Sequence, residues 1–189
     1  MKVDVVAVGT ELLLGQIVNT NAAEIGARLA EEGLDHHHQC VVGDNLDRIV
    51  DVLRIVGERA DAVIVTGGIG PTPDDLTREA LAVLAGTDLE FDPAVAEALR
   101  RYWADRGREM PESNLRQAYR PAGAAFVENP IGTAPGIRIE IDGTWYFALP
   151  GVPVEMRAML DAEVLPFLRR LAGGGGVVLS RVLRTWGES

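Results

Sequence analysis

Short apolar runs and amphipathic stretches alternate through the first half of the chain. The runs 3–8 and 62–66 are rich in β-branched residues and nearly free of charge, which is typical of buried parallel strands. The stretch 35–42 predicts another strand between them, and Asn19 and Asn45 are capping residues that precede helical spacing. The helices expected from that spacing cover about 20–32, 46–56 and 77–85. This order predicts right-handed βαβ units and a mainly parallel sheet.

The second half of the chain predicts a hairpin followed by a long helix. Residues 137–141 alternate apolar and polar side chains, Asp142-Gly143 is a turn signal, and 145–149 forms the returning apolar strand. A helix with an apolar face begins after Pro153, and Pro166 should end or kink it. The other elements expected are a helix from Asp92-Pro93, a short helix from Ser113-Asn114 through Tyr119, and a short strand over about 124–127.

These elements predict an α/β fold, a three-layer α/β/α sandwich whose mainly parallel sheet carries the hairpin as an antiparallel edge. We expect one nucleotide-binding domain over residues 1–171, a glycine linker over 172–176, and the truncated start of another domain over 177–189. Four consecutive glycines indicate the linker. The apolar residues after them have nothing to pair with, which favours a sequence that stops inside a longer protein.

Composition narrows the classes of function. The 189 residues carry a formal net charge of −10, which argues against general affinity for nucleic acid or for anionic membranes. The one cysteine, Cys40, rules out an internal disulfide and a four-thiolate zinc site. No apolar run approaches the roughly 20 residues of a membrane span, and Asp4 interrupts any secretory signal at the start. We therefore expect a cytoplasmic protein.

The stretch 62–77 is the strongest candidate for chemistry. Gly67, Gly68 and Gly70 follow the central strand directly, and glycine loops of this kind turn backbone N–H groups toward phosphate oxygens. Asp75 stands between this loop and the next helix. A carboxylate beside a phosphate repels it unless a divalent cation lies between them, so the pattern indicates a metal-bound phosphate. The alternative is a tight turn in which the Asp side chain only caps the helix.

Polar motifs follow several of the predicted strands. They are Gly9-Thr10-Glu11, Gly43-Asp44-Asn45, the stretch 67–75, and Pro150-Gly151 after the hairpin. Because the carboxyl ends of parallel strands lie on one edge of a sheet, we expect Glu11, Asp44 and Asp75 to face one pocket. Glu11 could instead cap a helix or pair with an arginine, and Asp44 could be a helix N-cap. The loop 132–136 has little side-chain bulk and could let a ligand approach the backbone.

Two nearby groups of residues are assigned no chemistry. Asp74 is expected to face solvent rather than a metal. His36, His37 and His38 are consecutive, so at most two of them share one face of a strand, and a structural role is favoured over a zinc site.

Five ordered motifs resemble the amino-terminal domain of the competence/damage-inducible protein A (CinA) family. That domain is similar to the molybdopterin-binding domain of molybdenum-cofactor biosynthesis proteins. The resemblance spans nearly all of residues 1 to about 170. The motifs occupy 9–16 with 19–21, 42–45, 66–72 with 75–77, 132–136 and 149–156.

The resemblance implies metal-dependent hydrolysis of the pyrophosphate of ADP-ribose to AMP and ribose 5-phosphate. It implies Asp75 and Asp44 in metal or nucleotide handling. The convergence of the strand ends adds Glu11, so Asp75, Asp44 and Glu11 are the expected catalytic and metal-binding residues, with Mg²⁺ or Co²⁺ as the expected metal. The residues expected to bind phosphate or nucleotide are Thr10, Gly67, Gly68, Gly70, Thr72, Thr77, Gly132, Thr133, Pro150 and Gly151. Related domains often carry a basic residue before the acid where this chain has Pro73-Asp74, and Arg78 is the candidate to replace it.

Two other functions remain open at this point. The same phosphate and metal site could adenylylate molybdopterin from ATP. Alternatively, the domain could bind a nucleotide without catalysis and assemble with partners. The partners expected are a small nucleotide substrate and further copies of the chain in a homo-oligomer, a dimer or trimer, with no direct nucleic-acid or membrane partner.

Overall fold

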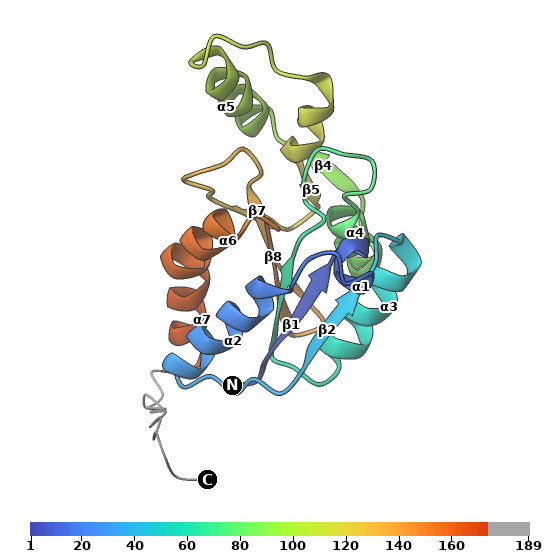
Figure 1. Ribbon diagram of the computed structural model, residues 1–189, viewed down its shortest axis with the longest axis vertical. Helices are drawn as coiled ribbons and strands as arrows, with labels where there is room; N and C mark the ends of the chain where they lie inside the picture. Colours follow the sequence, from blue (N-terminus) through green and yellow to red (C-terminus); the bar gives the residue numbers. More distant parts are fainter. Residues whose placement is uncertain (174–189) are drawn as a thin grey trace.

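A central six-stranded sheet lies between two layers of helices in the computed structural model, which describes residues 1–173 (Figure 1). The strands are β1 (Val3–Val8), β2 (Gln39–Val42), β3 (Ala62–Thr66), β6 (Ala125–Val127), β7 (Gly136–Ile141) and β8 (Thr144–Leu149), in the order β2-β1-β3-β8-β7-β6. The first four strands in that order are parallel, whereas β7 and β6 pair in an antiparallel manner. The three-layer prediction and its antiparallel edge are therefore confirmed. The predicted linker from residue 174 onward and the segment 177–189 lie outside the described residues.

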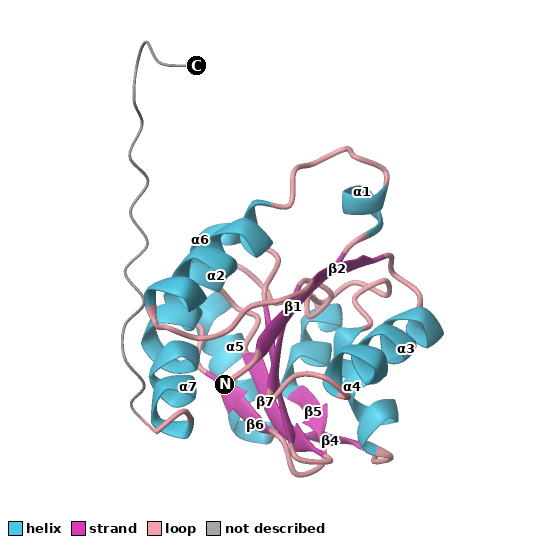
Figure 2. Cartoon of the chain, turned by 90° about the horizontal axis from the view of Figure 1, so that it is seen from below, coloured by secondary structure: helices cyan, strands magenta, loops and turns pink. Residues whose placement is uncertain are grey.

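The two helical layers follow from the alternation of side chains along the strands. On one face, α3 (Leu46–Gly57) and α4 (Thr77–Ala85) pack on alternate strand residues such as Val63 and Val65. On the other face, α2 (Thr20–Glu31) and the helix after Pro153 cover the sheet (Figure 2). They pack there on Ala62 and Ile64. All five residues of β3 are buried, as expected of a central parallel strand.

The helix after Pro153 does not end at Pro166. It runs as α6 (Pro153–Met159), a π-helical turn η2 (Leu160–Val164) and α7 (Leu165–Leu171). Proline has no N–H to give to a preceding turn, and the wider π turn just before it accommodates that loss without ending the helix. The apolar face of the whole helix stays buried.

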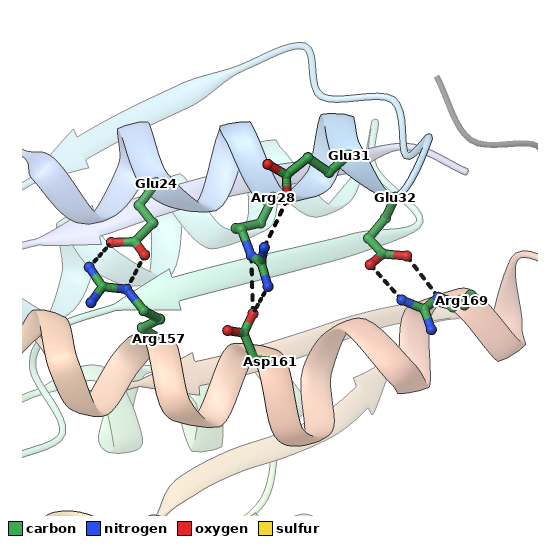
Figure 3. Close-up of polar contacts among 7 residues, drawn as sticks. All are labelled: Glu24, Arg28, Glu31, Glu32, Arg157, Asp161 and Arg169. Carbon is green, nitrogen blue, oxygen red and sulfur yellow. Dashed lines mark hydrogen bonds and ion pairs between the residues drawn. The ribbon is translucent and has the colours of Figure 1, made fainter. Parts of the chain in front are cut away.

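Three ion pairs join α2 and the residue that follows it, Glu32, to this helix along its exposed side (Figure 3). Glu24 pairs with Arg157, Arg28 with Asp161 at 2.5 Å, and Glu32 with Arg169 at 2.5 Å. The apolar faces of both helices are buried against the sheet, and the ion pairs lie on the solvent side of that packing.

Residues between α4 and β6 form a small unit beyond the sheet. It contains β4 (Leu89–Phe91), α5 (Pro93–Ala104), the 3-10 helix η1 (Glu112–Ala118) and β5 (Tyr119–Pro121). Asp92 caps α5, as Asp92-Pro93 predicted, through Ala94 N at 2.9 Å. The antiparallel pair β4–β5 was not expected, and the short helix expected up to Tyr119 is the 3-10 helix, which ends one residue earlier.

The second predicted strand is also shorter than expected. It begins at Gln39, because the amides of His37 and His38 bond to the buried carboxylate of Asp4. Among the described helices, none is both long enough and apolar enough to cross a membrane.

Candidate functional site

The candidate site is a pocket of about 400 Å³ at the carboxyl ends of β1, β3 and β8. It is lined by Val8, Gly9, Glu11, Asp44, the loop residues 67–71, Asp74, Asp75, Gln117, Thr133, Ala134, the residues 150–152, and Glu155. The structure therefore brings Glu11, Asp44 and Asp75 to one pocket, as the rule for open parallel sheets predicted.

A second cavity, of about 770 Å³, lies at the opposite edge of the sheet. It is lined by both signs of charge, including Lys2, Arg59 and Asp142. Its Tyr146 hydroxyl donates to Leu53 O at 3.2 Å, and burial raises the pKa of Tyr146 to about 12, so the phenol stays protonated at neutral pH. The predicted acids and the glycine loop line the smaller pocket and not this cavity, so we place the candidate site at the carboxyl-terminal edge of the sheet.

The charge of the candidate pocket is one-sided. Five carboxylates line it: the three predicted acids, Asp74, which is exposed, and Glu155 from the first turn of α6. No Lys, Arg or His is among the lining residues in the described part of the chain. A phosphate could enter such a pocket only with a cation that offsets the repulsion.

Asp44 is held by a reciprocal pair of hydrogen bonds. Its Oδ2 accepts from Thr10 N at 2.8 Å, and its own N–H donates to Thr10 Oγ1 at 3.1 Å. The cap of α3 is Asn45, whose side chain accepts from Arg48 N. The alternative of Asp44 as an N-cap is therefore wrong, and its carboxylate is aimed at the pocket instead.

Asp75 is fixed within its own loop. Its Oδ2 accepts from Thr72 N at 2.8 Å and from Thr72 Oγ1 at 2.5 Å. Helix α4 begins after Leu76 without any side-chain cap. The alternative in which an Asp only caps this helix is therefore wrong.

Glycines make room for three of the carboxylates. A Cβ added to Gly9 would lie 2.6 Å from Glu11 Oε1, and one added to Gly70 would lie 2.5 Å from Asp75 Oδ2. A Cβ on Gly132 would overlap the carboxylate of Glu155. These small residues therefore set where the acids sit, in addition to leaving the loops open.

The glycine loop after β3 is pinned from both sides. Gly67 and Gly68 have φ values of +100° and +67°, which favour glycine. The buried Thr77 hydroxyl donates to Gly67 O at 2.8 Å, and Thr77 N donates to Gly68 O at 2.9 Å. In residues 1–173 the N–H groups of Gly68, Ile69 and Gly70 have no protein acceptor, so the loop presents three adjacent donors.

Gly67 does not share this property. Its N–H donates to Leu149 O at 2.9 Å, and a Cβ there would overlap the carbonyl of Val8. The prediction that Gly67 binds phosphate through its amide therefore needs correction. Its small size instead lets the chain leave β3 close to the carbonyl of Val8 at the end of the neighbouring β1.

The other predicted binding residues fall into two groups. Thr133 and Gly151 line the pocket, as does Pro150, whose carbonyl accepts from Thr66 Oγ1 at 3.1 Å. Those outside the lining support it: Thr10 holds Asp44, Thr72 holds Asp75, Thr77 holds the glycine loop, and Gly132 leaves space for Glu155. Their role as direct ligands stays a prediction.

Arg78 does not line the pocket and lies beneath the glycine loop, so its role as the basic residue near the phosphate stays a prediction. It is 1% exposed and donates to Ile69 O at 2.8 Å from beneath the loop, where burial lowers its pKa. Arg116 of η1 contacts the later part of the loop. It donates to the carbonyls of Thr72 and Asp75 and pairs with Glu79 at 2.7 Å.

Several contributors were not predicted from the sequence. Glu155 follows the last strand of the hairpin, so the strand-end rule could have found it. Gln117 and Arg116 come from η1, which follows no strand of the central sheet, and no sequence signal marked them. Asn129 donates to Glu155 Oε2 at 2.7 Å and was also not marked.

The carboxylates fit a metal that arrives with its ligand. In the part of the chain that the structure describes, no three His, Cys, Asp or Glu side chains are grouped to hold a metal alone. Within residues 1–173, Asp44 and Asp75 each keep one oxygen with no protein donor. Mg²⁺ is commonly bound by one or two carboxylates together with phosphate oxygens and waters, and this donor set suits that arrangement.

The histidines serve the sheet, as expected. His36 Nδ1 lies 2.8 Å from Val3 O, and His38 Nδ1 lies 3.1 Å from Asp4 Oδ2. Burial opposes ionisation of Asp4, but the hydrogen bonds from the His38 and His37 amides outweigh it and lower its pKa. This cluster anchors the start of β2 away from the candidate site.

The parallel sheet, the pinned glycine loop and the acidic pocket define an α/β domain with a candidate ligand site at its strand ends. The chain belongs to the family described as "Probable molybdopterin binding domain", whose model matches residues 4–170. Within that family it is similar to CinA-like proteins. That from Frankia casuarinae is 49% identical over 192 residues, covering 99% of this chain and 44% of the relative. That from Nostoc sp. is 47% identical over 188 residues, with 99% and 44% covered. The chain thus spans less than half the length of these relatives.

Solved structures agree with this assignment. The protein CinA from Thermoplasma acidophilum superimposes with a TM-score of 0.79 at 39% identity, over 85% of this chain and 94% of that one. The molybdopterin biosynthesis enzyme MoaB from Thermus thermophilus gives a TM-score of 0.61 at 26% identity, over 90% and 92%. The recognition of the CinA family from its motifs is confirmed.

Proposed function

We propose that this domain hydrolyses the pyrophosphate bond of ADP-ribose, with a divalent metal, to AMP and ribose 5-phosphate. The observation that carries the proposal is the pairing of three free amides with five carboxylates in a pocket that no basic side chain of the described residues lines. Amides suit phosphate oxygens, and the acids suit a hard cation bound to the same phosphates. Water is the second substrate: a P–O bond of the anhydride breaks, and water supplies the new oxygen on phosphorus.

The residues of the chain divide this work. The N–H groups of Gly68, Ile69 and Gly70 would orient one phosphate across the glycine loop. Asp44 and Asp75, with Glu11 beside them, would hold the metal through oxygens that the loop hydrogen bonds leave free. A divalent metal supplies charge neutralisation at the phosphates and Lewis-acid activation of water. Since the described lining of the pocket contains no histidine, the carboxylates are the groups that can take up the proton released from water.

Adenylylation of molybdopterin is the second candidate. It is favoured by the family's description and by the similarity to MoaB. The same amides and acids would then bind a nucleoside triphosphate. Incubation with ATP and molybdopterin, followed by identification of the products, separates the two activities.

The test is product release from ADP-ribose with Mg²⁺ or Co²⁺. Wild-type chain should form AMP and ribose 5-phosphate in equal amounts by ion-exchange chromatography. Asp75→Asn and Asp44→Asn should each lower the rate by about 10²-fold or more. Asp51→Asn is the matched control, since Asp51 is exposed on α3, pairs with Arg54 and lies outside the pocket lining. Absence of AMP from the wild-type chain, or equal rates in all variants, would overturn the proposal.

A further inference from the structure

Arg116 joins the small unit beyond the sheet to the loop that carries Asp75. It belongs to η1 and lies 41 positions along the chain from Asp75. Its Nη1 donates to Thr72 O, and its Nη2 donates to Asp75 O at 3.3 Å and to Glu79 Oε1 at 2.7 Å. One side chain therefore ties both ends of the segment 72–75 to the first turn of α4, where Glu79 lies.

The segment 72–75 has little other support from the rest of the chain. Thr72, Pro73 and Asp74 are exposed, so packing against neighbours contributes little to its conformation. Among the described residues, the hydrogen bonds that reach this segment from outside it come from Arg116. The backbone of the segment is therefore held in place mainly by the guanidinium.

That backbone sets where the Asp75 carboxylate lies. Thr72 holds Asp75 Oδ2 through its N–H and its hydroxyl, and Asp75 N donates to Thr72 O at 3.1 Å. Arg116 bonds to the carbonyls of the same two residues. Because Arg116 is not among the residues that line the candidate pocket, it acts on the loop rather than on a ligand.

The planar guanidinium suits these acceptors. Its N–H donors have a fixed fork geometry, whereas the ammonium of a lysine is a single point on a flexible stem. Glu79 Oε2 is buried and has no hydrogen-bond partner among the described residues, so Arg116 is the donor on which this carboxylate depends. An arginine can hold two carbonyls and a carboxylate at once, which a lysine cannot do with the same geometry.

Resting on the proposed function, we infer that Arg116 is a positioning residue for the metal site: it fixes the backbone of 72–75 and thereby the Asp75 carboxylate. A carboxylate that is already held in place binds a metal-bound phosphate without first losing conformational freedom. Without Arg116, the segment has to be ordered when the ligand binds, and that cost lowers the affinity for the metal-bound ligand.

The experiment measures the gain in ADP affinity that Mg²⁺ provides, by calorimetric titration with and without the metal. The gain should be about tenfold or more for wild type and less than about threefold for Arg116→Met and for Arg116→Lys. The affinity for ADP without Mg²⁺ should change little, because the free amides of residues 68–70 lie outside the segment that Arg116 holds. A general disturbance of the fold would weaken both affinities and leave the gain unchanged.

Two control variants separate this role from that of an ion pair. Glu79→Gln removes the charge but keeps an amide oxygen that can accept from the guanidinium, so it should retain the gain from Mg²⁺. Arg120→Met removes ion pairs to Glu90 and Asp92 within the same small unit, and it should retain the gain as well. Urea unfolding of the same samples verifies that each variant is folded.

The inference is overturned if Arg116→Met keeps the wild-type gain, if Arg116→Lys restores it, or if either control loses it to the same extent. A gain that depends on Arg116, without hydrolysis of ADP-ribose, would support the positioning role and sink the proposed reaction. Hydrolysis together with a gain that Arg116→Met does not alter would do the reverse. A wild-type chain that gains nothing from Mg²⁺ would sink both.

Discussion

The substitution Gly70→Ala should move the Asp75 carboxylate while changing the stability of the fold only slightly. It therefore tests the importance of the carboxylate's position. The added Cβ would lie 2.5 Å from Asp75 Oδ2, 2.9 Å from Oδ1 and 3.0 Å from Cγ. Non-bonded heavy atoms prefer about 3.5–4.0 Å, so the carboxylate has to move by roughly 1 Å. The φ of Gly70 is outside the range that demands glycine, so the backbone itself should accept alanine.

The expected effect on activity is large and the effect on stability small. A displacement of about 1 Å at a catalytic group can cost about 10²-fold in rate, or roughly 2.7 kcal/mol in the barrier. The hydrogen bonds that Asp75 makes to Thr72 are exposed, so water can replace them. The free energy of unfolding should therefore change by less than about 1 kcal/mol. Any loss of stability is partly offset because alanine lowers the entropy of the unfolded chain.

The assay combines kcat/KM for ADP-ribose with urea unfolding on the same samples. Gly26→Ala is the control, since Gly26 lies in α2 away from the pocket and only flexible side chains of Gln39 and His36 approach its Cβ. That control should keep its activity. A Gly70→Ala variant with activity within about threefold of wild type would refute the importance of the Asp75 position.

Three further results are expected. Thr77→Val should lower the free energy of unfolding by about 1–3 kcal/mol, because Gly67 O loses a buried donor. Thr77→Ser keeps the hydroxyl and should retain most of the wild-type stability. Equal unfolding curves for the two variants would contradict this. Glu155→Gln should weaken Mg²⁺-dependent binding of ADP-ribose about tenfold in calorimetry, and unchanged affinity would remove Glu155 from the site. Arg157→Gln should lower the urea midpoint at pH 7. The hydrogen bond from Arg157 holds the pKa of Glu24 below its ordinary value of 4.5, so the stabilisation is fully present above that value and is lost as pH falls through the lowered pKa. The midpoint difference between the variant and wild type should therefore shrink as pH falls below 4.5, and a difference that stays the same in Glu24→Gln protein would show that the pair is not its source.

Periodicity was sufficient for the elements that are buried on both faces or bounded by strong turn chemistry. Strand β3 is wholly buried and short, so its composition alone indicates a strand. The hairpin followed from Asp142 and Gly143, whose φ values of 50° and 84° are the ones a tight two-residue turn requires. Strands β4 and β5 were missed because each has only three residues, most of them partly exposed, and their pairing depends on the packing of α5 between them in the chain.

The site was predictable as far as topology determines it. Strand order alone brings Glu11, Asp44 and Asp75 to one edge. The sequence does not predict which glycine amide lacks an acceptor. Gly67 and Gly68 are equivalent in sequence, but the N–H of Gly67 donates to a carbonyl of β8. The space that Gly132 leaves for Glu155 likewise depends on how the 132–136 loop lies against the first turn of α6.

The central claim is that a cation joins the pocket acids to a diphosphate. Calorimetric titration of ADP with and without Mg²⁺, on wild-type chain and on the Asp44→Asn, Asp75→Asn double variant, tests it most directly. Mg²⁺ should strengthen binding to wild type about tenfold or more, and the double variant should show no such gain. An equal gain in both proteins, or tight ADP binding to wild type without any divalent metal, would contradict the account.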